Sequence, residues 1–364
     1  MNRFKNIKKI LVLKFRHIGD VLLIVPTIMA LKETFPEASI AVVVNAGTEE
    51  VLAGHKLIDE LIIFDRSVKK LPALKKISRE IGFIQNIRRR NFDMTVDLTS
   101  GDRAAILSFF SGAKYRLANN PGTKGFPGKR LIYSHISDID NKKHMVLQNL
   151  DVVNQFGISA ENGDVDFFIS DKTKGKVARL FEENSIKKGD RIVHIHPTSR
   201  WMFKCWDDTY MAEIIDWLCT ERMKVILTSA PDREEVARAE RILSLLSDET
   251  KSSGNIIPLL GKTTIKELAA ISDAADIFFG VDSAPMHIAA AVKTPVIALF
   301  GPSGHYGEWY PHGDGHIVLT KNLPCKPCHK DMCEGVELRE CMRAIKPHDV
   351  QEAVIKILKL KREP

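Results

Sequence analysis

Short apolar runs alternate along the first half of the chain with longer segments in which apolar residues recur at helical spacing. The apolar runs, several of them rich in valine and isoleucine, predict buried strands at 7–15, 39–45, 60–64 and 92–98. Helical patterns cover 21–35, about 69–90 and 101–111. A stretch rich in Gly, Pro, Asn and Lys at 119–130 predicts a surface loop.

A second series of the same kind begins near residue 191. Strands are predicted at 191–196, 224–229, 255–259, 276–281 and 295–301. Helices are predicted at 208–220, 233–246, 265–272 and 284–292, with an amphipathic helix at 350–360. The charged segment 171–188 predicts a linker helix followed by a turn. Two successive βαβ series predict an α/β protein whose two parallel-sheet domains, 1–170 and 171–364, face each other across a cleft.

Composition agrees with a soluble protein of two domains. The chain has 364 residues, of which 44% are hydrophobic and 27% charged, so disorder and a disulfide-dense mini-protein are excluded. The longest apolar run, 21–31, is interrupted by Pro26 and Thr27 and is shorter than the roughly 18–20 residues of a membrane-spanning helix. The N-terminus shows no signal-peptide pattern, so a cytoplasmic protein is expected.

Charge and cysteine content suggest partners without choosing among them. The net charge of +7 and the pI of about 9.0 favour an anionic partner: nucleic acid, an anionic membrane surface or a phosphorylated substrate. Cysteines at 325, 328, 333 and 341 form a cluster. Four thiolates suit zinc, but the spacing does not match a regular zinc ribbon, so a structural or redox role, zinc and catalysis all stay open.

The unusual polar residues follow predicted strands, where ligands bind in parallel sheets. In the segment 16–20, Gly19 permits close approach of a ligand, and Asp20 stands at a helix N-terminus as either a cap or a reactive carboxylate. In 196–206, hydroxyl, guanidinium and ammonium groups suit phosphate oxygens, although a solvated loop is the alternative. In 280–287, a strand leads into a helix whose first N–H groups suit an anion, and His287 is either functional or simply buried.

Several familiar signatures are missing from the sequence. GxxxxGK[ST], GxGxxG, GxSxG and HExxH do not occur, which removes support for P-loop hydrolysis and ordinary dinucleotide binding. Two Asp-x-Asp pairs, at 138–140 and 164–166, lie in charged, loop-like sequence, and so short a pattern arises easily by chance. No metal site is predicted from them.

Taken together, the three segments resemble glycosyltransferase family 9, the heptosyltransferases that add heptose from an ADP-sugar to the inner core of lipopolysaccharide. The matching segments are RHIGDVLL at 16–23, HPTSRWMFKCW at 196–206 and GVDSAPMHIAAAVKTPVIALFGPS at 280–303. The resemblance covers essentially the whole chain, and the downstream CKPC segment looks most like the heptosyltransferase III subgroup. It implies a GT-B fold of two Rossmann-like domains, with the acceptor on 1–170 and the nucleotide sugar on 171–364. It also implies inversion at the anomeric carbon, no bound metal, and no cofactor beside the donor.

The resemblance implies a role for individual residues. Asp20 matches the general base, and Lys204 stabilises the leaving ADP. The residues implied in donor binding are Thr198, Ser199, Lys204, Asp232, Thr263, Asp282, Ser283, Ala284 and His287. The resemblance implies that an acidic residue within 232–235, taken here as Asp232, contacts the ribose. It also implies that the backbone near Thr263 contacts the adenine. Many relatives have Thr-Gly-Leu-Ser where this chain has Ser-Ala-Pro-Met at 283–286.

Basic residues of the first domain suit an acceptor that carries phosphates and carboxylates. Arg16, Gly19, Arg103, Arg116 and Arg130 are the candidate acceptor-binding residues. The same charge suits peripheral contact with the anionic inner face of the cytoplasmic membrane. Another GT-B transferase or an epimerase acting on a different nucleotide sugar is the alternative. A non-enzymatic zinc- or nucleic-acid-binding protein is a remote one, because aromatics are not interleaved on a basic stripe, and no nucleic acid partner is expected.

Overall fold

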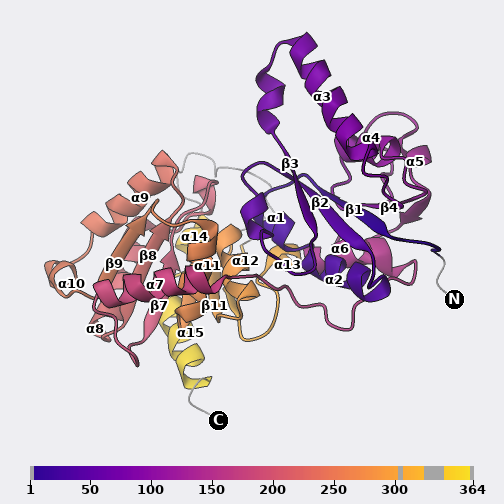
Figure 1. The fold of residues 1–364 in the computed structure, drawn as a ribbon. Helices are drawn as coiled ribbons and strands as arrows, with labels where there is room; N and C mark the ends of the chain where they lie inside the picture. The colour runs from indigo at the N-terminus through magenta and orange to yellow at the C-terminus, as the bar shows by residue number, and fades with distance from the viewer. Residues whose placement is uncertain (1–3, 302–305, 324–339, 361–364) are drawn as a thin grey trace. The chain divides into compact units, whose positions relative to one another are not determined.

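The computed structural model describes residues 4–301, 306–323 and 340–360, and the chain divides into two compact units. Unit 1 is Met1–Phe168 and unit 2 is Ile169–Pro364, so the division lies two residues before the expected boundary. Each unit contains a six-stranded sheet in which every strand pair is parallel (Figure 1).

The sheet of unit 1 has the strand order β3-β2-β1-β4-β5-β6. Its strands are β1 (Lys9–Lys14), β2 (Ser39–Asn45), β3 (Glu60–Phe64), β4 (Met94–Asp97), β5 (Tyr115–Asn119) and β6 (His135–Ser137). Its helices are α1 (Ile18–Leu22), α2 (Val25–Thr34), α3 (Ala73–Arg88), α4 (Asp102–Phe110), α5 (Lys129–Ile132) and α6 (Met145–Asn154), with 3₁₀ turns η1 (Glu49–Val51) and η2 (Arg66–Lys70). Every residue of β1 after Lys9 is buried, as expected of a central parallel strand.

The sheet of unit 2 has the corresponding order β12-β11-β10-β7-β8-β9. Its strands are β7 (Ile192–His196), β8 (Lys224–Ser229), β9 (Ile256–Leu260), β10 (Ile277–Val281), β11 (Val296–Leu299) and β12 (Ile317–Leu319). Its helices are α7 (Asp171–Glu183), α8 (Asp208–Thr220), α9 (Arg233–Ser244), α10 (Asp248–Ser252), α11 (Ile265–Ala274), α12 (Ala284–Ala291), α13 (Tyr306–Trp309), α14 (Glu340–Arg343) and α15 (Pro347–Leu360), with the 3₁₀ turn η3 (Met202–Lys204).

The nine predicted strands are all present, but β5, β6 and β12 were not predicted. Only Leu117 and Ala118 are buried in β5, and β6 and β12 have three residues each, so none of them carries a clear apolar run. The predicted helix 21–35 is two helices, α1 and α2, because Pro26 in the first turn of α2 lacks the N–H that would continue α1. No described helix is long and apolar enough to cross a bilayer.

Each sheet has a switch point, at which successive strands begin to be added on the other side of the first strand. β1 lies between β2 and β4, and β7 lies between β8 and β10. In open parallel sheets of this kind, ligands bind beyond the carboxyl ends of the strands at such a switch point. The loops that follow β1, β4, β7 and β10 are therefore where this fold is expected to bind ligands.

Candidate functional site

An ion pair joins the two loops at the switch point of unit 2. β7 and β10 pair in parallel with His196 opposite Gly280, so the loops after these strands start side by side. Lys204, at the end of η3, places its Nζ 2.6 Å from Oδ2 of Asp282, and their side chains are 26% and 13% exposed. The structure thus brings together two residues that the sequence placed 78 positions apart.

Helix α12 begins directly after this ion pair. Ser283 is its N-cap residue, Ala284 and Pro285 form its first two positions, and the backbone N–H groups of a first turn lack intrahelical acceptors. The Oγ of Ser283 is buried and has no hydrogen-bond partner among the described residues. His287 is buried, with its ring edge-on to Trp309 at 6.3 Å between centroids. The N-terminus of α12 therefore offers donors next to the Lys204 ammonium.

The close spacing of β7 and β10 depends on Gly280. A Cβ at this position would lie 2.8 Å from the carbonyl oxygen of His196 and 3.0 Å from the ring of Phe278. Only glycine avoids these contacts, so this residue sets how closely the two loops approach.

The buried side chain of Trp206 anchors the loop after β7 to the rest of unit 2. The indole is 1% exposed, and its Nε1 donates to the carbonyl oxygens of Met342 (3.0 Å) and Ile345 (3.1 Å). Trp201 in the same loop is 49% exposed. The segment 196–206 is therefore not a freely solvated loop, because one end of it belongs to the core of unit 2.

A chain of buried polar groups runs beneath the carboxyl ends of β7 and β8. His194 bonds to Ser272 Oγ through Nδ1 and to Thr228 Oγ1 through Nε2, both at 2.8 Å. His196 Nδ1 lies 2.9 Å from the same Thr228 oxygen. Burial lowers the pKa of His196 to about 3 and holds that of His194 well below its ordinary value, so both imidazoles are neutral at pH 7.

Glu235 connects this layer to the loop after β7. Thr198 Oγ1 donates to Glu235 Oε2 at 2.8 Å, and His196 Nε2 lies 3.9 Å from that oxygen. Burial raises the pKa of Glu235. Asp232, by contrast, is exposed and caps α9 by accepting the N–H groups of residues 234 and 235. Of the acidic residues in 232–235, Glu235 is therefore the one that contacts a predicted donor-binding residue.

The two remaining predicted donor-binding residues lie at the same edge. Ser199 is buried, and its Oγ accepts the backbone N–H of Trp201 at 3.3 Å. Thr263 is half-buried in the loop between β9 and α11, next to Thr264, which caps α11. The predicted donor-binding residues thus all follow strands or begin helices at the carboxyl edge of one sheet.

In unit 1, Asp20 is the third residue of the five-residue helix α1. Its Oδ2 accepts the backbone N–H of His17 at 3.3 Å, so the carboxylate supports the start of the helix. Asp20 is half-buried, and Gly19 beside it is buried. Arg16 is exposed and donates from Nη2 to the carbonyl oxygen of Thr99 at 3.3 Å, which joins the loop after β1 to the loop after β4.

Two buried charged side chains that the sequence did not indicate lie below these loops. Lys14, the last residue of β1, donates to the carbonyl oxygen of Leu98 (2.9 Å) and to Asn149 Oδ1 (3.1 Å), and burial lowers its pKa to about 8. Asp97, the last residue of β4, accepts from Tyr133 Oη at 2.5 Å, and burial raises its pKa. The available signal was their position, because both are charged residues at the carboxyl ends of buried strands.

The candidate acceptor-binding arginines do not converge on one point. Arg103 pairs with Glu80 at 2.7 Å, and its guanidinium lies 4.0 Å from the centre of the Phe64 ring. Arg116 donates to the carbonyl oxygens of residues 132 (2.5 Å) and 113 (2.7 Å). Arg130 is exposed on α5. Arg103 and Arg116 therefore have clear structural contacts within unit 1.

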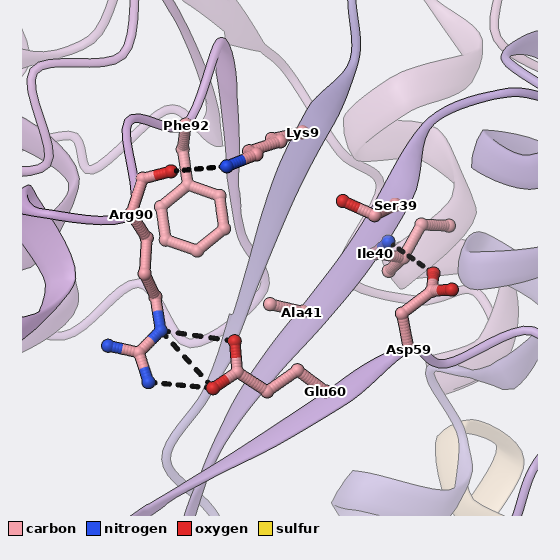
Figure 2. Close-up of a pocket in the computed structure, with 8 residues that line it drawn as sticks. All are labelled: Lys9, Ser39, Ile40, Ala41, Asp59, Glu60, Arg90 and Phe92. Carbon is pink, nitrogen blue, oxygen red and sulfur yellow. Dashed lines mark hydrogen bonds and ion pairs between the residues drawn. The ribbon is translucent and has the colours of Figure 1, made fainter.

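A pocket lies at the opposite, amino edge of the unit 1 sheet (Figure 2). Its polar groups pair with one another: Arg90 binds Glu60 through two nitrogens, Lys9 Nζ donates to the Arg90 carbonyl oxygen at 3.1 Å, and Asp59 accepts the Ile40 N–H at 2.7 Å. These contacts hold together the starts of β1, β2 and β3. The pocket is separate from the switch-point loops, which lie at the carboxyl edge.

Within the described residues, no group of three or more His, Cys, Asp or Glu side chains is arranged to hold a metal ion. Cys325, Cys328 and Cys333 lie outside the described residues. Cys341 lies in α14, where it is buried in the apolar core of unit 2.

Known proteins resemble the chain in sequence and in fold. The family model for glycosyltransferase family 9 (heptosyltransferase) matches residues 81–337. Lipopolysaccharide heptosyltransferase 3 of Escherichia coli (strain K12) is 34% identical over 344 residues, which cover 94% of this chain and 96% of that protein. A family 9 glycosyl transferase from Veillonella parvula DSM 2008 superposes with a TM-score of 0.81 at 20% identity, covering 96% of this chain and 97% of its own.

A heptosyltransferase from E. coli, solved with ADP-2-deoxy-2-fluoro heptose, superposes with a TM-score of 0.72 at 18% identity, covering 96% of this chain and 99% of its own. The shared fold confirms the expected GT-B architecture of two Rossmann-like units. By the match of its sequence to the family and to a relative over nearly its whole length, the chain belongs to glycosyltransferase family 9, the heptosyltransferases.

Proposed function

We propose that this protein transfers heptose from ADP-heptose to the inner core of lipopolysaccharide. The relative from E. coli strain K12 is named for lipopolysaccharide heptosyl transfer, and a solved relative holds an ADP-heptose analogue. In this proposal the donor binds at the carboxyl edge of the unit 2 sheet. The acceptor binds at the carboxyl edge of the unit 1 sheet.

The contact between Lys204 and Asp282 carries the proposal. An ammonium has three N–H donors. Among the described residues one of them goes to Asp282, which holds the side chain beside α12 and leaves two donors for diphosphate oxygens. The first-turn N–H groups of α12 and the Ser283 hydroxyl supply further donors. Negative charge that develops on departing ADP is thereby stabilised without a metal ion.

The bond from Thr198 to Glu235 defines what the loop after β7 can offer. The threonine hydroxyl has one proton, and it donates that proton to the Glu235 carboxylate at 2.8 Å. Thr198 therefore contacts a phosphate oxygen through its backbone N–H rather than through its hydroxyl. We assign the ribose contact to Glu235, which bonds Thr198, in place of Asp232, which caps α9.

The reaction we propose is a single displacement. An acceptor hydroxyl oxygen attacks the anomeric carbon of heptose, the bond from that carbon to the diphosphate oxygen breaks, and its electron pair leaves with ADP. The hydroxyl proton passes to the Asp20 carboxylate, which acts as the general base. Attack from the face opposite to ADP inverts the configuration at the anomeric carbon.

Acceptor and membrane contacts complete the proposal. We assign the exposed side chains of Arg16 and Arg130 to acceptor phosphates and carboxylates, and buried Gly19 to the point of close approach in the loop after β1. Arg103 and Arg116 contribute positive charge to the same unit from their internal contacts. Because the chain has a net charge of +7, we also propose peripheral contact with the anionic cytoplasmic face of the membrane.

Product mass tests the proposal directly. The protein is incubated with defined truncated lipopolysaccharide acceptors and with ADP-heptose, UDP-glucose or UDP-N-acetylglucosamine. We expect one heptose to be added from ADP-heptose and no transfer from the UDP-sugars. Transfer from a UDP-sugar at an equal rate would support the alternative, a GT-B enzyme that uses another nucleotide sugar.

A further inference from the structure

Helix α3 carries an apolar stripe that the fold of unit 1 does not cover. Leu74, Ile77 and Ile81 are 84%, 54% and 48% exposed, and their spacing of three and four residues places them on one side of the helix. In Figure 1, α3 extends away from the strands of unit 1. Buried Ile87 and half-buried Phe83 attach the helix to the core on another side, so the exposed stripe is additional to its packing.

The neighbouring helices α4 and α5 continue this apolar surface. On α4, Ile106, Phe109 and Phe110 are 37%, 52% and 50% exposed at positions i, i+3 and i+4, and on α5 Leu131 is 86% exposed. Helix α4 packs against both α3 and α5. The guanidinium of Arg88, on the same side of α3 as the stripe, fills the space beside Gly112 just after α4. We call the exposed side of these three helices the α3–α5 face.

Positive charge is concentrated on the same part of the chain. Residues 69–131 contain 14 Lys and Arg but only four Asp and Glu, a net charge of +10, whereas the whole chain has +7. The rest of the molecule is therefore net negative. Lys75, Lys76, Arg79, Arg88 and Arg89 are exposed on or next to α3. The acidic residues of α3 and α4 are both paired, Glu80 with Arg103 and Asp102 with Lys129.

We propose that the α3–α5 face docks on an anionic lipid bilayer, with its apolar side chains in the interface and the exposed cations on and next to α3 reaching the headgroups. Exposed leucine, isoleucine and phenylalanine among lysine and arginine are the pattern of an interfacial helix. A second copy of the chain is disfavoured, because it would bring the exposed lysines and arginines of two α3 helices together. The inference rests on the membrane contact in the proposed function and assigns a surface to it.

Vesicle flotation with the full-length protein tests this inference. We expect binding to phosphatidylglycerol vesicles at 50 mM salt, at least tenfold weaker binding at 500 mM salt, and little binding to phosphatidylcholine vesicles. The apolar variant Leu74→Ser/Ile77→Ser/Ile81→Ser and the charge variant Lys75→Gln/Lys76→Gln/Arg79→Gln should each reduce binding at least tenfold. The matched control is Leu245→Ser/Ile355→Ser, which changes two exposed apolar residues of unit 2 (49% and 43%) and should bind as wild type does.

Two further measurements make each outcome decisive. All variants should keep the wild-type melting temperature, since the substituted side chains are exposed, and should transfer heptose to a soluble, lipid-free acceptor at the wild-type rate. The inference is overturned if the apolar variant and the charge variant both bind vesicles as strongly as wild type does. It is also overturned if sedimentation velocity shows a monomer–dimer equilibrium that only the apolar variant abolishes. Vesicle binding without any heptose transfer leaves the docking surface standing and removes the proposed function.

Discussion

Asp20 supports the start of α1, and we propose that it is also the general base; one substitution separates the two roles. In Asp20→Asn the amide oxygen can still accept the His17 N–H that the carboxylate accepts at 3.3 Å, so the start of α1 is preserved. An amide cannot take a proton from the acceptor hydroxyl, and loss of a general base typically costs about 10²–10⁴-fold in rate. We expect heptose transfer to fall by that factor while the melting temperature and ADP affinity stay unchanged. A folded, ADP-binding variant within a few-fold of wild-type turnover would falsify the assignment.

Lys204 should act mainly in the transition state. In the proposed reaction its ammonium neutralises diphosphate charge that grows as the sugar–oxygen bond breaks, so Lys204→Ala should lower kcat and kcat/KM together. Lys204→Arg should recover part of the activity, because it restores the cation opposite Asp282 but with a planar fork in place of a point charge.

The control for Lys204 is the double variant Lys204→Ala/Asp282→Asn. The double variant removes both charges of the ion pair. Compared with Lys204→Ala, it should regain any stability lost because the Asp282 carboxylate had no partner, but it should not regain turnover. Steady-state kinetics with saturating ADP-heptose, together with thermal melts, separate the two effects. Wild-type kcat in Lys204→Ala would show that the residue does not stabilise the leaving group.

At the level of residues, the sequence indicated the loops but not the groups beneath them. Asp282 and Lys204 stand out because polar residues follow apolar strands, and the structure pairs them at 2.6 Å. Lys14 and Asp97 are the last residues of β1 and β4, so the sequence pattern predicts strand ends there and gives no sign of their buried contacts. That Glu235 rather than Asp232 contacts Thr198 depends on how α9 is rotated against β7, which no local pattern encodes.

The pairing of β7 with β10 should be sensitive to a single methyl group. In Gly280→Ala the new Cβ would lie 2.8 Å from the His196 carbonyl oxygen, and such overpacking costs about 1–3 kcal/mol. Gly175→Ala is the matched control, because Gly175 lies inside α7 with nothing within 4 Å of its Cβ position. That change should stabilise the protein by about 0.5–1 kcal/mol. Urea denaturation measures both, and equal effects would contradict the close approach at Gly280.

The buried histidines of β7, His194 and His196, should make the stability of the protein sensitive to acid. In the unfolded chain His196 takes up a proton below pH 6.5, whereas in the fold its pKa is about 3. Stability is therefore lost as pH falls from 6.5 toward 3, at up to about 1.4 kcal/mol per pH unit for each such histidine. His196→Asn, whose amide can replace Nδ1 toward Thr228, should show a shallower fall of melting temperature with acid.

Glu235 changes the pH dependence of stability in the opposite direction and serves as the control for His194 and His196. Its pKa is raised above 4.5 in the fold, so it costs stability as pH rises through that value, and Glu235→Gln should remove this opposing contribution. The acid-side slope of Glu235→Gln should be steeper than that of wild type. Parallel pH profiles for wild type and His196→Asn would contradict a neutral, buried His196.

At the level of elements, the predictions succeeded where burial leaves a periodic signal. β1 and β2 are apolar over nearly their whole length and were predicted within two residues of their ends. β6 and β12 have three residues each, so they carry no periodic signal. They are strands because a neighbouring strand offers unpaired hydrogen-bonding groups, which is a property of the sheet and not of the segment.

At the level of the whole molecule, chemistry and charge are divided between the units. The predicted donor-binding residues all belong to unit 2, whereas Asp20, the candidate acceptor-binding residues and the α3–α5 face belong to unit 1. Both units have the same strand order, with the fourth strand of each placed beside the first. One architecture therefore provides two carboxyl edges, and from their different side chains we propose that one binds a diphosphate and the other an acidic acceptor.

This division predicts which backbone amides each ligand protects from hydrogen exchange. A ligand that binds only the folded state suppresses local opening around its site, by an amount that grows with its concentration over Kd. ADP at saturation should slow exchange most strongly in 197–206, 230–236, 261–264 and 282–288, the segments that follow β7, β8, β9 and β10. A soluble acceptor should instead slow exchange most in 15–22 and 98–104, after β1 and β4.

ADP on Lys204→Ala provides the internal reference for this experiment, because it should give weaker protection in the same unit 2 segments and no new protection elsewhere. The strongest ADP protection at 15–22 would reverse the assignment of donor and acceptor to the two units. Protection by ADP of the amino-edge segments 39–41 and 58–60 instead would place the nucleotide in the pocket of Figure 2, where Arg90 and Glu60 already bind each other. Since the polar groups of that pocket are paired with one another, a diphosphate could enter it only by breaking the Arg90–Glu60 ion pair, and we expect those amides to exchange at the same rate with and without ADP.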